Sequence, residues 1–178
     1  MELPKRKNIR LKNYDYSQNG AYFITVCTQD RRHLFGEIVG ADLVSARMDL
    51  NPSGQMIEKI FLETVDSFDG IIADKYVIMP NHFHCIIVIS QGRVDTRSTP
   101  TKPLSSVVQV FKSKTTFEYI KRVKAGLLPP FNKQIWQRNY YEHVIRNEDD
   151  YLKTWKYIDE NPVRWAEDTY CCDKGNAD

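Results

Sequence analysis

Two histidines one residue apart are the residues of this chain whose type and spacing most directly suit chemistry. His82 and His84 lie in the stretch 76–90, which reads YVIMPNHFHCIIVIS. This pattern predicts a hairpin, with a short strand at 76–79, a proline–asparagine turn and a second strand at 82–89 that is rich in β-branched residues. Because side chains alternate between the faces of a strand, both imidazoles are expected on one face. Two such nitrogens suit a divalent cation, although a hydrogen-bonded pair without a metal would have the same spacing.

A tyrosine and an asparagine one helical turn apart form the second candidate pair. The segment 147–165 is predicted to be a helix that Asn147 caps. Its apolar stripe consists of Tyr151, Trp155 and Ile158. At about 100° per residue, Tyr157 lies about 140° from the centre of this stripe, and Asn161 lies one turn beyond it. A tyrosine outside the packing stripe is a candidate for chemistry, although most tyrosines are structural.

The two pairs together would make a phosphate-transfer site if the helix covered the histidines. A cation held by His82, His84 and the side-chain oxygen of Asn161 would bind phosphate oxygens as a Lewis acid, and Tyr157 would attack the phosphorus. A free phenol, with a pKa of about 10, is a poor nucleophile at neutral pH without such help. Asn161 precedes Pro162, which disfavours helical geometry, so an end cap is the alternative role for this asparagine.

The remaining predicted elements position these two halves of the site. They are strands at 21–28 and 140–145, helices at 51–68 and 104–123, and a two-stranded excursion at 34–39 and 43–50. The order matches a β-α-β-β-α-β split unit, so we predict an α+β, ferredoxin-like sheet with both crossover helices on one face. The histidine strand is central in that unit, and the C-terminal helix is expected to carry Tyr157 over the open face.

Composition is typical of a globular protein and leaves the partner open. The chain has 178 residues, of which 42% are hydrophobic and 27% charged, with a net charge of +2. We expect a single domain over 1–178, with a basic N-terminal arm at 1–20 and a polar tail at 166–178. No apolar run approaches the roughly 18 residues of a membrane span, so we expect a cytoplasmic protein without a membrane partner. The four cysteines lack a CxxC pair, which argues against a cysteine zinc site.

Basic residues gather in several places and could neutralise the phosphates of a nucleic acid. The candidate DNA-binding residues are Arg6, Arg10, Lys12, Lys112, Lys114, Arg138 and Arg146. A solvated face or surface ion pairing explains each of them equally well. His143, in the predicted strand 140–145, is expected to be structural, with a phosphate contact as the alternative.

Four stretches taken together resemble the REP-associated tyrosine transposases, which are relatives of the single-tyrosine HUH, IS200-like transposases. The stretches are RKNIRLKNYDYSQNGAYFITVCTQDRRHLFG, YVIMPNHFHCIIVI, VVQVFKSKTT and IWQRNYYEHVIRNEDD continuing to YIDENPVRW. The resemblance implies a metal-dependent endonuclease and strand transferase for single-stranded DNA that acts at hairpins of palindromic repeats. It also implies that His82, His84 and Asn161 bind Mg²⁺ or Mn²⁺ and that Tyr157 forms a 5′-phosphotyrosine link.

Two other functions remain open on the sequence. The first is a non-catalytic, domesticated protein that only binds hairpin DNA, and the second is a histidine-ligated hydrolase of small molecules. The second lacks a carboxylate beside the histidines that would serve as ligand or base. Whether the protein acts as a monomer or a homodimer is left open.

Overall fold

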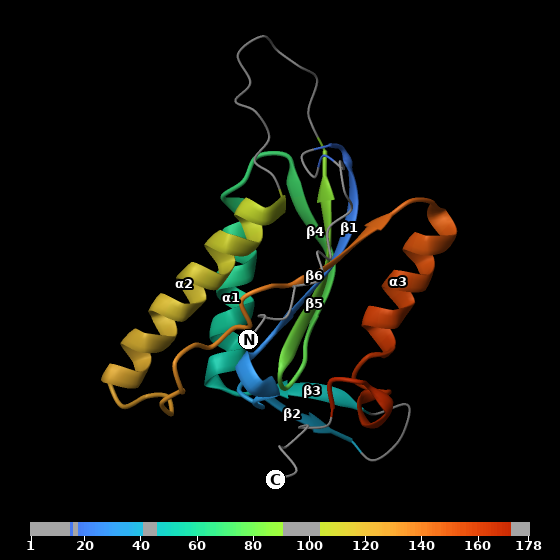
Figure 1. The fold of residues 1–178 in the computed structure, drawn as a ribbon. Coiled ribbons are helices and arrows are strands. Elements are labelled where there is room, and N and C mark those ends of the chain that lie inside the picture. Colours follow the sequence, from blue (N-terminus) through green and yellow to red (C-terminus); the bar gives the residue numbers. More distant parts are fainter. Residues whose placement is uncertain (1–14, 16–17, 41–45, 91–103, 172–178) are drawn as a thin grey trace, which may run out of the picture.

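A four-stranded antiparallel sheet is the centre of the fold (Figure 1). The computed structural model describes residues 15, 18–40, 46–90 and 104–171. The strands lie in the order β4-β5-β1-β6. Their bounds are Gly20–Cys27 for β1, Ile71–Ile78 for β4, His82–Ile89 for β5 and Tyr141–Ile145 for β6. This is the order of the predicted split unit, so the ferredoxin-like, α+β prediction is confirmed.

Helices cover the two faces of the sheet unequally. Figure 1 shows α1 (Pro52–Asp66) and α2 (Leu104–Lys124) on one side of the sheet, and α3 (Glu148–Glu160) on the other. A large apolar core lies between the sheet and the first two helices. Under α3 a second, small core consists of Phe23, Ile86 and Ile158. The expectation that the last helix covers the histidine side of β5 is therefore confirmed.

Strand β4 is longer than predicted. We expected a strand at 76–79, whereas β4 runs over Ile71–Ile78. The first half of β4 lacks the regular alternation of apolar and polar residues from which a strand is predicted. The pairing register shifts between Ala73 and Lys75, and Ile72, although apolar, is 57% exposed on this edge strand.

Smaller predicted elements also have counterparts. The excursion after β1 forms a separate two-stranded sheet of β2 (Gly36–Val39) and β3 (Arg47–Leu50); part of the predicted second strand, 43–45, lies outside the described residues. Helix α3 ends at Glu160, five residues before the predicted end at 165, and turns and a short 3₁₀ helix, Trp165–Glu167, follow it. Among the helices that the structure describes, none has both the length and the apolar composition to cross a membrane.

Candidate metal and tyrosine site

The two histidine side chains lie together on the face of the sheet that α3 covers. Both are fully or almost fully buried, and their ring centroids are 4.3 Å apart. Strand β5 is held between β1 and β4, and Thr25 of β1 pairs directly with His84. The prediction that both imidazoles share one face is therefore confirmed, and two neighbouring strands fix their positions.

Asn81 determines which nitrogen of His82 is available to a ligand. The Nδ2 atom of Asn81 donates to the carbonyl oxygens of Arg31 (3.1 Å) and Tyr170 (2.7 Å). Its Oδ1 is therefore left to accept from Nδ1 of His82, at 2.9 Å. In this tautomer the lone pair of His82 is on Nε2, which is buried and has no hydrogen-bond partner among the described residues. A buried nitrogen of this kind is suited to bind a cation.

His84 is held in the same manner by Thr25. The Oγ1 atom of Thr25 lies 2.8 Å from Nδ1 of His84, and Nε2 of His84 lies 3.4 Å from the hydroxyl of Tyr157. When Nδ1 donates to Thr25, the lone pair on Nε2 faces the tyrosine. Burial lowers the pKa of His82 to about 4 and lowers the pKa of His84 well below its usual range, and the nearby His82 lowers the latter further. Both rings are therefore neutral at physiological pH, as metal binding requires.

Helix α3 brings Tyr157 to the histidines from beside the predicted packing stripe, of which Ile158 lies in the small core and Tyr151 packs against it. Ile158 is fully buried and is the centre of the contact, whereas Trp155 is 37% exposed and lies beside Lys75 of the edge strand. Tyr157 therefore flanks the contact instead of facing away from it. Its ring is edge-on to His84 (centroids 5.2 Å apart) and to Phe23 (5.9 Å). A helix that lies along a sheet contacts it over a wide arc, so a narrow stripe was too restrictive a prediction.

Asn161 keeps helical backbone angles (φ −58°, ψ −42°) although a proline follows it. Its Nδ2 atom donates to Oδ2 of Asp168 at 3.0 Å. Its Oδ1 atom is buried and has no hydrogen-bond partner among the described residues. The side chain thus does more than end the helix, because an amide oxygen without a donor is a suitable ligand for a hard cation.

Asp168 is a further candidate ligand that the sequence analysis did not identify. Donor atoms of His82, His84 and Asp168 all lie within 4.8 Å of one another. The sequence analysis assigned Asp168 to a polar tail, yet residues 165–171 fold over the histidines. In the sequence, only the aromatic residues Trp165 and Tyr170 within this polar stretch indicate such packing.

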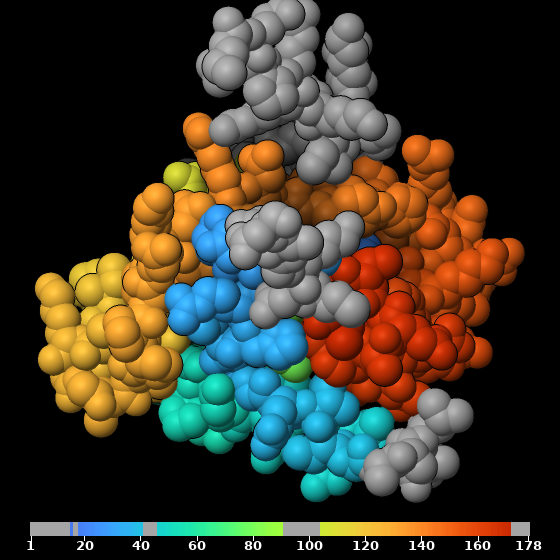
Figure 2. Space-filling model, turned by 60° about the horizontal axis from the view of Figure 1, so that its bottom comes forward, coloured from blue at the N-terminus to red at the C-terminus, as the bar shows by residue number. Residues whose placement is uncertain are grey.

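Contacts with the beginning of the chain hold this C-terminal segment in place. The ring of Tyr170 packs on His82 (centroids 4.7 Å apart), and the guanidinium of Arg31 lies over Tyr170. Arg31 also donates to the carbonyl of Thr169 at 2.6 Å. Figure 2 shows the C-terminal part of the described chain, in red, lying against the blue segment that follows β1.

The surroundings of Tyr157 keep its hydroxyl protonated. Burial raises the pKa of Tyr157 to about 12, and the negative charge of Asp168 contributes to the increase. The described side chains alone therefore do not favour ionisation of this hydroxyl. A nearby positive charge would reverse this effect.

The candidate DNA-binding residues that the structure describes do not form one cluster. Arg6, Arg10 and Lys12 lie outside the described residues. The ammonium group of Lys112 donates to the carbonyls of Gln137 and Asn139, and burial lowers its pKa to about 8.

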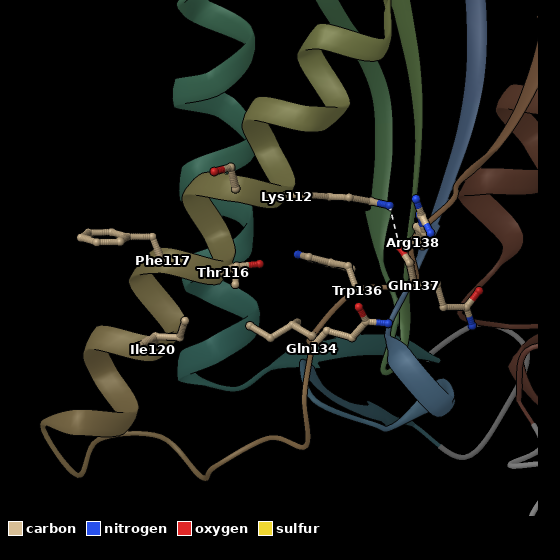
Figure 3. Close-up of a pocket in the computed structure, with 10 residues that line it drawn as sticks. Lys112, Thr116, Phe117, Ile120, Gln134, Trp136, Gln137 and Arg138 are labelled. Carbon is tan, nitrogen blue, oxygen red and sulfur yellow. Dashed lines mark hydrogen bonds between the residues drawn. The ribbon is translucent and has the colours of Figure 1, made fainter.

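The other three described candidates lie on different elements. Arg138 shares with Lys112 a depression of about 440 Å³ between α2 and the segment before β6 (Figure 3). Lys114 borders a different depression, between α1 and α2. Arg146 is exposed at the junction of β6 and α3. A DNA-binding role for these residues stays a prediction.

His143 has a carboxylate partner. Its Nε2 atom lies 2.9 Å from Oδ2 of Asp150, and this contact links β6 to α3. The expected structural role is thereby supported.

A comparison with protein families decides what kind of protein has this site. A family model described as "Transposase IS200 like" matches residues 16–161, a span that includes His82, His84, Tyr157 and Asn161 but not Asp168. The chain belongs to this family. The resemblance read from the sequence is therefore confirmed, and the protein is an IS200-like transposase.

Individual relatives agree with this family. The transposase is 36% identical to an uncharacterized protein of Haemophilus influenzae, over 92% of this chain and 91% of the relative. It is 28% identical to a REP-associated tyrosine transposase of Escherichia coli K12, over 84% of this chain and 70% of the relative. A solved structure of a REP-associated tyrosine transposase bound to a REP hairpin matches with a TM-score of 0.57 and 25% identity, covering 87% of this chain and 73% of that one.

Proposed function

We propose that this IS200-like transposase is a metal-dependent endonuclease and strand transferase that cleaves single-stranded DNA beside a hairpin through Tyr157. One observation carries the proposal: the hydroxyl of Tyr157 lies 3.4 Å from Nε2 of His84, next to the buried Nε2 of His82, which has no hydrogen-bond partner in the described part of the chain. A solved relative with this fold is bound to a REP hairpin, which supports a hairpin as the DNA partner.

The donor atoms at the site fit a divalent cation. His82 and His84 would supply imidazole nitrogens, and Asn161 and Asp168 would supply oxygens. Such a mixture of two nitrogens and hard oxygens suits Mn²⁺, and the oxygens together with DNA phosphate suit Mg²⁺. When bound, the cation supplies positive charge that polarises the scissile phosphate and favours the ionised phenol.

The protein's own residues would then position the reaction. The phenol oxygen of Tyr157 forms a bond to the phosphorus as the bond from phosphorus to the 3′ oxygen breaks. The phenol loses its proton in this step, and the departing oxygen gains one to become a 3′-hydroxyl. The products are a 5′-phosphotyrosine and a free 3′ end, and attack by another 3′-hydroxyl would complete strand transfer. Most of the rate enhancement would come from holding the phosphate in line with Tyr157.

The test is formation of a covalent protein–DNA adduct. A library of DNA stem-loops with random single-stranded flanks is selected for binding to the Tyr157→Phe protein, and the selected hairpin is incubated with wild-type protein and Mn²⁺. We expect an adduct that survives denaturing electrophoresis with wild-type protein and with the control Tyr151→Phe, which changes another tyrosine of α3. Tyr157→Phe should give none. A wild-type protein that forms no adduct would overturn the proposal.

The alternative of DNA binding without cleavage has one observation in its favour, which is the raised pKa of Tyr157. A protein of that kind would bind the selected hairpin equally well after His82→Ala, and its binding would weaken as salt increases. The adduct assay separates the two functions, because only the nuclease becomes attached to its DNA.

A further inference from the structure

A depression beside Tyr157 is lined, apart from Tyr157 itself, by residues that have no part in the reaction described above. Its volume is about 270 Å³, and it lies between β1, β6 and α3. It is lined by Phe23, Tyr141, His143, Lys153, Thr154 and Tyr157. The lining combines aromatic rings with one ammonium group and contains no carboxylate.

The aromatic rings form the walls of this depression. The rings of Tyr141 and Tyr157 both make edge-to-face contacts with the ring of Phe23. The interplanar angles are 68° and 85°, and the centroids are 6.2 and 5.9 Å apart, respectively. Phe23 is almost fully buried, whereas Tyr141 is 46% and Tyr157 42% exposed. Exposed aromatic faces beside a reactive tyrosine are suited to stack on a nucleobase, because every base has a flat π surface.

The ammonium group in the lining is available to a phosphate. Lys153 lies one helical turn before Tyr157, is exposed, and forms no ion pair within the part of the chain that the structure describes. Its neighbour on α3, Lys156, is by contrast paired with Glu160 at 3.5 Å. The nearby carboxylate of Asp150 already contacts His143 and the backbone N–H of Arg146.

We propose that this depression binds the nucleotide that adjoins the phosphate attacked by Tyr157. Its base stacks on Tyr141, and Lys153 contacts the phosphate on the far side of that nucleotide. The inference rests on the proposed function, since Tyr157 defines where the scissile phosphate lies. The site gives Tyr141 and Lys153 roles in holding single-stranded DNA in line for cleavage.

The test uses a fluorescent base and a protein that cannot cleave. The hairpin selected on the Tyr157→Phe protein is made with 2-aminopurine at one flank position at a time, because stacking quenches this base. In the Tyr157→Phe protein we expect quenching at the position beside the cleavage point. We expect Tyr141→Ala, added to Tyr157→Phe, to restore the fluorescence there. Phe117→Ala removes an aromatic side chain that is 72% exposed on α2, and it should leave the quenching unchanged.

Affinity for the same hairpin provides a second readout. Loss of one stacked base should weaken binding by about 10-fold in Tyr141→Ala. Lys153→Gln should weaken it and reduce its salt dependence, whereas the matched change Lys156→Gln should do neither. Retained circular dichroism shows that each variant is folded.

The outcomes separate this inference from the proposed function. Quenching that persists in the Tyr141→Ala protein, or that occurs at no flank position, overturns the nucleotide site even if wild-type protein forms the covalent adduct. Quenching that depends on Tyr141 when no adduct forms shows that a base stacks in the depression, and in that case the proposed cleavage, and with it the place of this base beside a scissile phosphate, is overturned.

Discussion

The hydrogen bond between Thr25 and His84 makes a prediction about metal binding that can be worked out from the structure. Thr25 is buried, and its Oγ1 atom lies 2.8 Å from Nδ1 of His84. Thr25→Val keeps the shape of the side chain and removes the hydroxyl, so that the buried N–H of His84 loses its acceptor. Such a loss costs about 1–3 kcal/mol. For a protein of this size, a loss of about 2 kcal/mol lowers Tm by about 4–8 °C.

The same change should also weaken metal binding. When the hydroxyl of Thr25 accepts from Nδ1 of His84, Nε2 of His84 has a free lone pair for a cation. Loss of such an orienting partner typically lowers metal affinity by about 10–100-fold. Titration calorimetry with Mn²⁺ measures the affinity, and urea unfolding with a chelator present measures stability. Thr25→Ser, which keeps the hydroxyl, is the control and should retain most of the affinity. An unchanged Mn²⁺ affinity in Thr25→Val would refute the reasoning that Thr25 sets the tautomer.

Three more predictions concern other parts of the site. Asp168→Asn should lower Mn²⁺ affinity in the same calorimetric assay, whereas Glu167→Gln, at its exposed neighbour, should not; equal effects would remove Asp168 from the ligand set. Ile158→Ala should weaken the docking of α3 by about 3 kcal/mol, measured as faster amide hydrogen exchange in α3, whereas Leu152→Ala on the exposed side should change exchange little. In chelator-treated protein, unfolding free energy should fall as pH drops from 6.5 toward 4, because the unfolded chain protonates His82 first; the folded pKa of about 4 makes the loss about 3 kcal/mol at the acid end. His82→Asn should reduce that dependence, and the buried His84, whose pKa is also lowered, should keep part of it. A pH profile identical to that of wild type would contradict the lowered pKa of His82.

Local patterns were sufficient to predict the order of strands and helices and the positions of the two histidines. Alternation along 82–89 placed both imidazoles on one face, and the order of strands and helices determined which face would need a cover. Helical spacing identified Tyr157 and Asn161 as candidates, although it did not show that Tyr157 also contacts the sheet through Phe23. These predictions depended on contacts within one element or between elements with regular spacing.

The rest depended on contacts between distant parts of the chain. Asp168 reaches the histidines because Arg31 and Asn81 donate hydrogen bonds to the backbone carbonyls of Thr169 and Tyr170. Contacts of this kind leave no periodic pattern in the sequence from which they could be predicted. The sequence likewise identified Lys112 as a basic candidate, but did not show that two backbone carbonyls would accept hydrogen bonds from its ammonium group. Such features follow from the path of irregular segments, which sequence patterns describe least well.

The two cores of this protein differ greatly in size, so the stability of the fold and the placement of Tyr157 depend on different sets of residues. Most apolar side chains are buried with α1 and α2, whereas the layer that carries the tyrosine rests on a cluster of three buried residues. A variant with a damaged α3 would still have a sheet with an intact main core. The yield and solubility of a variant are therefore poor guides to whether Tyr157 is still correctly placed, and a direct readout at the site is needed.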